Sequence, residues 1–354
     1  MLYSGIDLHK RFSVISTMNN KGEIISQAKV KNQQDLLLQY FNKLDDSSHK
    51  AVIEATFAWG WLADLLEDNK IKVMLAHPQK TKAIASARIK TDKVDANILA
   101  HLLRSDMVAP AHYTDKDGRD QQELLRTRAR LVHTKTSLKN KVHSILHKHN
   151  LNPEWDNKSF TDIFGKKGRA WMESKTNKLP PNSQFAFKQL LISIDNLAVQ
   201  IKDFDKQIKT VWQQDGNAQI LQKLPGIGYY GSLILSSEIG EIKRFSRPEN
   251  LCSYAGLTPS VYQSGDKTRM GKIKKGNKYI RWVLIEAVPK TIKKDKRLLN
   301  FYLKICKKKG NKKAKVATAR KMLAQIHLIL RNKKTFIQEP GIPAFFSDQD
   351  PTKG

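Results

Sequence analysis

Two aspartates stand three residues apart in a stretch that is predicted to open a helix, Lys90-Thr91-Asp92-Lys93-Val94-Asp95-Ala96. Positions i and i+3 lie on one face of a helix, so Asp92 and Asp95 can bind the same cation. The same residues also fit an ordinary helix start, in which Thr91 or Asp92 caps the helix and Asp95 is favoured by the helix dipole. The choice between cap and ligand depends on acids elsewhere in the chain.

Two further acids lie in predicted strands. Asp7 stands in the first strand on the face opposite Ile6 and Leu8, and Glu54 ends the fourth strand. A carboxylate in the middle of an apolar strand costs free energy unless it is paired or bound to a metal. If the helix that begins at Asp92 packs across these strands, all four carboxylates converge.

A two-metal catalytic site is therefore predicted from Asp7, Glu54, Asp92 and Asp95. Two ions about 4 Å apart share oxygen ligands and stabilise both the attacking and the leaving oxygen in phosphodiester displacement. Hard oxygen ligands without a cluster of His or Cys favour Mg2+, with Mn2+ as an alternative, over zinc.

The elements that position these acids follow from the hydrophobic pattern. Alternating or continuous apolar residues predict strands, and apolar residues at helical spacing predict helices. Three strands, a helix, a strand, a helix and a strand in this order are typical of a ribonuclease-H-like α/β sheet covered by helices. The strands are predicted at residues 2–8, 12–18, 22–30, 50–55 and 71–76, and the helices at 32–44 and 58–69.

The charge of the chain points to a polyanionic partner. The 354 residues include 63 Lys and Arg against 33 Asp and Glu, a formal net charge of +30. The charge is +3 over residues 1–112 (15 basic, 12 acidic), +8 over 113–250 (23 and 15) and +19 over 251–354 (25 and 6). The N-terminal region is nearly neutral and contains many of the acids, whereas the C-terminal region is strongly basic. This distribution indicates a catalytic domain followed by a nucleic-acid-binding region.

Two isolated cysteines, Cys252 and Cys306, indicate a reducing compartment and no zinc ribbon. No apolar run approaches the roughly 20 residues of a membrane span, and the N-terminus lacks a signal-peptide pattern. A cytoplasmic protein without a membrane partner is expected.

Residues beyond the α/β region are predicted to be mainly helical. Runs at about 120–149 and 184–210 have near-heptad spacing and are interpreted as an antiparallel helical arm, either packed within the chain or used for dimerisation. We expect an α/β catalytic domain at 1–112, the arm at 113–214, a C-terminal domain at 215–336 and a tail at 337–354 that is poorly ordered.

The stretch Pro225-Gly226-Ile227-Gly228 lies between two predicted helices and resembles a helix-hairpin-helix turn. Glycines in such a turn let backbone amides approach a phosphate closely. Phosphate binding by Gly226 and Gly228, or a packing element descended from such a hairpin, is predicted.

A loop dense in Ser, Gly, Lys and Arg is predicted between a short helix that ends at Gly256 and a helix that begins near Asn277. Ser264 precedes Gly265 among cations that would stabilise the charge on a phosphorane, so it is a candidate nucleophile. Ser260 and Tyr262 remain open on chemical grounds. The predicted nucleic-acid-binding residues are Lys10, Lys93, Gly226, Gly228, Lys267, Arg269, Lys272, Lys274, Lys275 and Arg281.

Five ordered motifs cover nearly the whole chain: Gly5 to Lys10, Ile53 to Thr56, Lys90 to Ala96, Leu224 to Gly228, and Ala255 to Pro259 followed by Gln263-Ser264-Gly265. In this order they resemble the DEDD transposases of the insertion-sequence one-ten type, a family that also contains the Piv-like DNA invertases.

The resemblance implies a RuvC-like N-terminal domain, a coiled-coil arm and a C-terminal transposase domain. It implies that Asp7, Glu54, Asp92 and Asp95 form the metal-binding tetrad, and Ser264 matches the family's serine nucleophile. It also implies excision of an element as a circle and insertion at a specific target, guided by a bridge RNA.

We therefore expect a Mg2+-dependent transposase or site-specific recombinase of an insertion sequence that cuts and rejoins DNA through a covalent phosphoserine. Synapsis needs at least two active sites, so a dimer or tetramer is expected. The alternatives are a Piv-like invertase, a RuvC-like junction endonuclease that needs no covalent serine, and a non-catalytic architectural protein, which leaves Asp7 unexplained.

Overall fold

The computed structural model describes residues 1–44, 48–56, 58–85, 91–156, 158–265, 267–273 and 275–332. The chain forms two compact units, Met1–Arg119 and Asp120–Gly354. Each unit is described by itself. The predicted tail at 337–354 and Lys274 lie outside the described residues.

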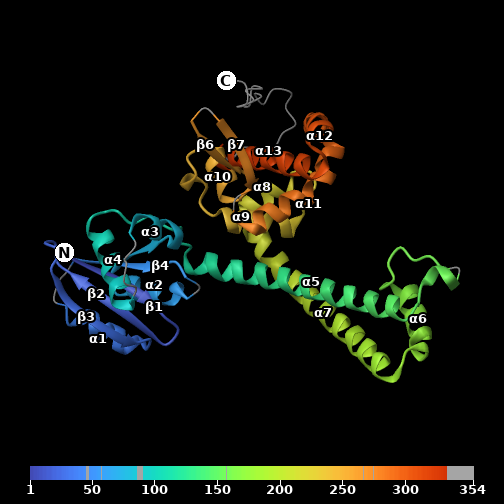
Figure 1. The fold of residues 1–354 in the computed structure, drawn as a ribbon, viewed down its shortest axis with the longest axis horizontal. Helices are drawn as coiled ribbons and strands as arrows, with labels where there is room; N and C mark the ends of the chain where they lie inside the picture. Colours follow the sequence, from blue (N-terminus) through green and yellow to red (C-terminus); the bar gives the residue numbers. More distant parts are fainter. Residues whose placement is uncertain are drawn as a thin grey trace. The chain divides into compact units, whose positions relative to one another are not determined.

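The first unit is built on a mixed five-stranded sheet with the order β3-β2-β1-β4-β5 (Figure 1). Strand β1 is central, antiparallel to β2 and parallel to β4. The predicted order of elements in this region is confirmed, and the sheet with its helices is a ribonuclease-H-like arrangement. The elements are β1 (Leu2–Leu8), β2 (Phe12–Met18), β3 (Ile24–Lys31), α1 (Gln34–Asn42), β4 (His49–Glu54), α2 (Trp59–Asp68), β5 (Lys72–Ala76), α3 (Pro78–Ile84) and α4 (Asp92–Arg104).

The two faces of this sheet bury different helices, because side chains alternate along each strand. Ile6 of β1 and Ile53 of β4 belong to the hydrophobic cluster that includes side chains of α1 and α2. On the other face, Val52 of β4 packs with Leu99 and Leu103 of α4. Since Asp7 and Glu54 alternate with Ile6 and Ile53, their positions belong to the face that α4 covers.

Helix α4 lies unusually close to β1 at Gly5. An added Cβ at Gly5 would lie 2.1 Å from the carbonyl oxygen of Ala96 and 2.4 Å from the amide nitrogen of Ala100. Both alanines are fully buried, so small side chains on the helix complement the missing side chain on the strand. This contact brings the first turn of α4 over the carboxyl end of β1.

The second unit is mainly helical. Its helices are the rest of α5 (Lys116–Lys148), α6 (Lys166–Lys175), α7 (Pro181–Gln214), α8 (Gly216–Gln222), α9 (Tyr229–Ile239), α10 (Pro248–Tyr254), α11 (Lys278–Lys294), α12 (Lys296–Lys309) and α13 (Asn311–Asn332). Side chains from α5 and α7 to α13 share one large hydrophobic core.

Helices α5 and α7 form the predicted antiparallel pair. The guanidinium of Arg128 on α5 donates to Asp205 on α7. At the other end of the pair, Nε2 of His149, the residue after α5, lies 3.2 Å from Oγ of Ser183 on α7. Helix α6 lies at one end of the pair (Figure 1). Side chains of α5, α6 and α7 form a separate hydrophobic cluster there. The predicted link between the two runs therefore contains α6 and contributes its own small core.

The predicted loop before Asn277 is wrong in part, since it contains an antiparallel hairpin. Strands β6 (Pro259–Ser264) and β7 (Lys267–Ile273) pair from Pro259 with Ile273 to Ser264 with Lys267. Gly265 has φ of +56°, a backbone conformation that two-residue hairpin turns require and that Gly adopts without strain. Strand pairing of the backbone thus orders this polar segment.

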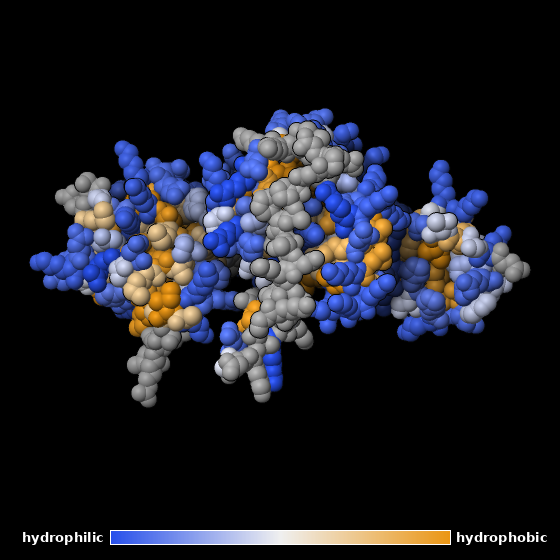
Figure 2. All heavy atoms as spheres, turned by 90° about the horizontal axis from the view of Figure 1, so that it is seen from above, coloured by the Kyte–Doolittle hydropathy of each residue, from blue (hydrophilic) through white to orange (hydrophobic). Residues whose placement is uncertain are grey.

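Hydrophilic side chains cover most of the face shown in Figure 2, with hydrophobic side chains in separate patches. Among the described residues, none of the helices combines the length and the apolar character that crossing a membrane requires. Cys252 and Cys306 are both free thiols.

Candidate active site

At the start of α4, the residue that caps the helix differs from the acids that could bind a metal. Thr91 is the N-cap, and its hydroxyl oxygen accepts a hydrogen bond from the amide of Val94 at 3.3 Å. Asp92 and Asp95 both lie in the first turn of the helix. Since Thr91 satisfies the cap, the carboxylate of Asp92 is available for another partner.

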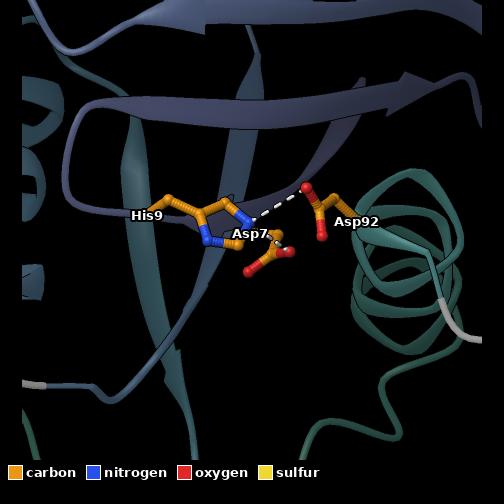
Figure 3. A group of neighbouring side chains, drawn as sticks. All are labelled: Asp7, His9 and Asp92. Carbon is orange, nitrogen blue, oxygen red and sulfur yellow. Dashed lines mark ion pairs between the residues drawn. The ribbon is translucent and has the colours of Figure 1, made fainter.

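That partner region is the end of β1, where three side chains meet (Figure 3). One ligand atom each from Asp7, His9 and Asp92 lies within 4.8 Å of the other two. The Nε2 atom of His9 is 3.1 Å from Oδ2 of Asp7 and 3.3 Å from Oδ2 of Asp92. The Asp7 side chain is only 18% exposed, against 37% for His9 and 48% for Asp92. A strand, the turn after it and a helix start therefore supply one cluster.

The electrostatics of this cluster oppose a bare negative charge on Asp7. Burial raises the pKa of Asp7 above its usual value, the positive charge of His9 lowers it, and the negative charges of Asp92 and Asp95 raise it further. An acid that is partly desolvated and faces two other acids is stabilised by a nearby cation. Asp95 therefore contributes to the same electrostatic site, although its oxygen atoms are not among the three clustered ligand atoms.

Glu54 is positioned next to Asp7 by strand pairing. Strands β1 and β4 are parallel, and Ile6 pairs with Ile53. Asp7 and Glu54 are each the next residue along their strands, so they emerge at neighbouring points on one edge of the sheet. The structure thus brings Asp7 and Asp92 together directly, places Asp95 within their electrostatic reach, and places Glu54 on the adjoining strand.

These residues fit a divalent metal ion. Carboxylate oxygens predominate in the cluster, and these are the ligands that a hard cation prefers. A bound cation would also offset the repulsion from Asp92 and Asp95 that contributes to the raised pKa of Asp7. Lys10 and Lys93, the predicted nucleic-acid-binding residues beside the cluster, are both exposed and follow His9 and Asp92 in the sequence.

Ser264 lies at the tip of the β6–β7 hairpin in the second unit, at the last paired position before the turn. The strands beside it present exposed residues of two kinds. Val261 and Tyr262 are exposed apolar and aromatic side chains, and Arg269, which pairs with Tyr262, is an exposed cation. Tyr262 also covers Gly271, where an added Cβ would lie 2.8 Å from its ring.

The base of the hairpin is closed by two glycines and one asparagine. An added Cβ at Gly276 would lie 2.4 Å from the amide nitrogen of Gly256. The amide of Asn277 donates to the carbonyl oxygen of Tyr254, and its side-chain oxygen caps α11. The guanidinium of Arg281 donates to the carbonyl oxygen of Ala255 at 3.3 Å. The chain therefore enters and leaves the hairpin at one fixed point.

A buried acid connects this base to helix α5. Glu238 is only 3% exposed and accepts two hydrogen bonds of 2.8 Å from Arg126. It also accepts one of 2.7 Å from the side-chain amide of Asn277. A bidentate pair with a buried carboxylate holds its partners in one geometry, so α5, α9 and the start of α11 are positioned relative to one another.

The Pro225–Gly228 turn packs on α11. An added Cβ at Gly226 would lie 2.7 Å from the carbonyl oxygen of Ala287, and Thr291 donates to the carbonyl oxygen of Pro225 at 2.6 Å. Gly228 caps α9 and has open space around it. Of the two predicted phosphate-binding glycines, Gly226 therefore faces another helix and Gly228 faces outward. Lys275 is exposed, while the side chains of Lys267 and Lys272 are outside the described set.

Comparison with known proteins bears on both units. A family model described as "Transposase IS116/IS110/IS902 family" matches residues 218–303, and a DEDD transposase model of the IS110 type matches residues 4–151. The chain belongs to this transposase family. The match at residues 218–303 covers the serine hairpin, and the match at residues 4–151 covers the metal cluster.

Curated relatives of this transposase include two bacterial proteins that match most of the chain. The transposase for insertion sequence element IS1111A of Coxiella burnetii is 27% identical over 75% of this chain and 73% of its own length. A probable family 20 transposase of Pseudomonas aeruginosa is 23% identical over 80% of this chain and 82% of its own length. The chain is thus an insertion-sequence transposase, an enzyme of DNA cutting and strand transfer, and its DEDD domain implies a divalent metal ion.

His9 is the residue of the cluster to which the sequence reasoning assigned no role. The signal that would have found it is the period of two in strands. Residues 5, 7 and 9 follow one another at this spacing, so the side that presents Asp7 to α4 also presents His9 in the turn that follows.

Proposed function

We propose that this transposase breaks and rejoins DNA through a phosphoserine intermediate at Ser264. The observation that carries the proposal is the place of Ser264 at the tip of a hairpin with a fixed base. The Ser264 oxygen attacks the phosphorus of the scissile phosphodiester and loses its proton, and the DNA 3′ oxygen leaves and takes up a proton. A 3′ hydroxyl of the exchanged strand then attacks the phosphoserine, which releases Ser264 and restores a phosphodiester.

Asp7, Glu54, Asp92 and Asp95 hold Mg2+, with Mn2+ as an alternative, in this proposal. The bound metal would supply positive charge to the non-bridging and leaving oxygens. The clustering of Asp7 and Asp92 and the effect of Asp95 on the pKa of Asp7 support a shared cation site. Carboxylates fixed by a central strand and a helix start are already oriented before DNA binds, which lowers the cost of assembling the site.

Nucleic acid binds along the basic surface of the second unit. Residues 251–354 carry 25 Lys and Arg against 6 acids, and exposed lysines gather where α12 meets α13. Within the described residues, none of these lysines forms an ion pair. The predicted contacts are made by Arg269, Lys275 and Arg281 in the described part of the hairpin region, by Lys267, Lys272 and Lys274, by Gly228, and by Lys10 and Lys93 near the metal site. The packing of Gly226 against α11 gives that residue a structural role instead. The lysines at the α12–α13 turn are Lys307, Lys308, Lys309, Lys312 and Lys313.

A structured guide RNA and a second protomer complete the reaction in our proposal. The family resemblance supports a bridge RNA, and the basic surface of the second unit is suited to binding a polyanion. Sequencing the RNA that copurifies with the transposase tests this part. An RNA with segments complementary to the flanking and target DNA supports it, and only random cellular RNA contradicts it.

The serine mechanism is tested with a DNA duplex that carries the abutted ends of the element and a nick that prevents religation. We expect the wild-type protein to form a covalent adduct in Mg2+ that maps to Ser264 by mass spectrometry. Ser264→Ala abolishes the adduct. Ser260→Ala and Tyr262→Phe are the matched controls, since they remove the two neighbouring hydroxyl groups of the same hairpin, and both retain it.

An adduct that persists in Ser264→Ala would exclude this serine. Loss of the adduct in Tyr262→Phe would transfer the role to the tyrosine. Efficient cleavage to free ends without any adduct would favour the junction-endonuclease alternative, which needs the acids alone.

A further inference from the structure

The turn after β1 contributes a nitrogen atom to the acidic cluster. We propose that His9 coordinates the divalent metal through Nε2, together with Asp7 and Asp92, and thereby favours Mn2+ over Mg2+. This inference rests on the metal centre proposed above and names a ligand beyond its four acids.

The distances within the cluster match those between ligands of one ion. Oxygen and nitrogen ligands lie about 2.0–2.2 Å from such a metal, so two ligands at a right angle are about 3 Å apart. The Nε2 atom of His9 is 3.1 Å from a carboxylate oxygen of Asp7 and 3.3 Å from one of Asp92 (Figure 3). All three ligand atoms lie within 4.8 Å of one another. A single cation can therefore touch all three side chains after small movements.

The Nε2 atom is also within reach of a cation placed between the two acids. It is shielded from solvent and lies 3.1 Å from Oδ2 of Asp7 and 3.3 Å from Oδ2 of Asp92. In the neutral form of the imidazole, the lone pair of this nitrogen would be available to such a cation.

The ring of His9 is held in place by the turn that carries it. Its centroid is 4.7 Å from that of Phe12, and the backbone amide of His9 donates to the carbonyl oxygen of Phe12 at 3.0 Å. These contacts come from the start of β2, which is paired with β1. The ligand is therefore positioned before the metal binds, and little side-chain entropy is lost on binding.

Metal preference follows from the donor type. Mg2+ favours oxygen ligands and keeps several waters. Mn2+ also takes carboxylate oxygens, but as a first-row transition-metal ion it accepts an imidazole nitrogen more readily than Mg2+ does. Replacement of His9 by Asn should therefore weaken Mn2+ binding by about tenfold or more and Mg2+ binding by less than about threefold. His9→Asp supplies a third carboxylate in the same turn and should shift the preference toward Mg2+.

The test is pulsed electron paramagnetic resonance of Mn2+ bound to the full-length protein, with calorimetric titration of Mn2+ and of Mg2+. We expect the spectrum to show coupling of the metal to an imidazole nitrogen in the wild type. This coupling is lost in His9→Asn and retained in His101→Asn, which replaces an exposed histidine in the last turn of α4. Asp7→Asn serves as the variant that removes the metal centre itself.

The outcomes separate this inference from the proposed function. Mn2+ binding that depends on Asp7 but shows no nitrogen coupling overturns the role of His9 and leaves the acidic centre intact. Equal losses of Mn2+ and Mg2+ affinity in His9→Asn overturn the selectivity. Metal binding that is absent, or unchanged by Asp7→Asn, overturns both proposals.

Discussion

The carboxylate of Asp7 is placed where its charge is useful to a bound cation and unfavourable without one. It is partly desolvated on the central strand, and its pKa is raised by burial and by the negative charges of Asp92 and Asp95. The positive charge of His9 opposes this effect only in part. The site therefore stores repulsion in the metal-free state, which metal binding relieves.

A stability measurement checks this electrostatic account. Because the folded pKa of Asp7 is raised above the ordinary value of 3.8, its contribution to stability is fully present below that value and is lost as pH rises through the folded pKa. At neutral pH without metal, Asp7→Asn should therefore raise the melting temperature by about 2–4 °C, the effect of about 1 kcal/mol. Metal should raise the melting temperature of the wild type and leave that of the variant unchanged.

The control for this prediction is Asp68→Asn, which changes an exposed acid at the end of α2. It should alter the free energy of unfolding by less than about 0.5 kcal/mol with and without metal. A lower melting temperature for Asp7→Asn than for the wild type in a chelating buffer would contradict the account.

Single residues differed in how far the sequence could place them. Asp7 was predictable because a charged residue in an apolar strand needs a partner, and Thr91 was one of two predicted caps. His9 was not assigned a role, because the period of two through residues 5, 7 and 9 predicts only the side on which it lies, and a lone histidine after a strand can equally be a surface residue. Its position depends on the path of the turn, which only the structure gives.

At the scale of elements, the contact of α4 with β1 determines where the acids of the helix lie. Gly5→Ala would place a methyl group 2.1 Å from the carbonyl oxygen of Ala96. A backbone atom cannot rotate away, so the helix must shift. We expect a loss of at least about 1–3 kcal/mol in the free energy of unfolding. If the variant stays folded, its metal affinity should fall because Asp92 moves with the helix.

Thermal unfolding and metal titration of the purified variant measure both effects. Gly216→Ala is the matched control, because an added Cβ there meets nothing within 4 Å. It should leave the free energy of unfolding and the metal affinity close to those of the wild type. Wild-type stability and metal affinity in Gly5→Ala would show that the close contact does not position α4.

The two strand regions show what sequence patterns can and cannot predict. Strands β1, β2 and β4 of the first unit have continuous or alternating apolar residues and are mostly buried. In the hairpin of β6 and β7, none of the side chains whose burial is described is buried, and the segment is rich in polar and basic residues, so no burial pattern distinguished it from a loop. Gly265 followed by a polar residue was the available turn signal.

On the scale of the whole molecule, helix α7 combines a low net charge with a row of exposed apolar side chains. Helix α7 carries four Lys and three Asp, whereas the chain has a net charge of +30. Its outer side exposes Phe185, Ile192 and Val199, at intervals of seven residues and with 67%, 50% and 62% of their surface accessible. The inner stripe, which includes Phe187, packs against α5 and α6. A nearly neutral helix with a second apolar stripe suits a protein partner better than nucleic acid.

We expect this outer stripe of α7 to pair with a second copy of the transposase, since strand exchange needs two active sites. A double variant, Ile192→Glu with Val199→Glu, should weaken self-association by at least about tenfold, because each change places a charge in an apolar contact. Both side chains are exposed, so folding should be retained. Sedimentation velocity with and without DNA measures the effect, and Leu303→Glu, at an isolated exposed leucine on α12, is the control. A monomeric wild type under all conditions, or equal association of the double variant, would exclude α7 as the interface.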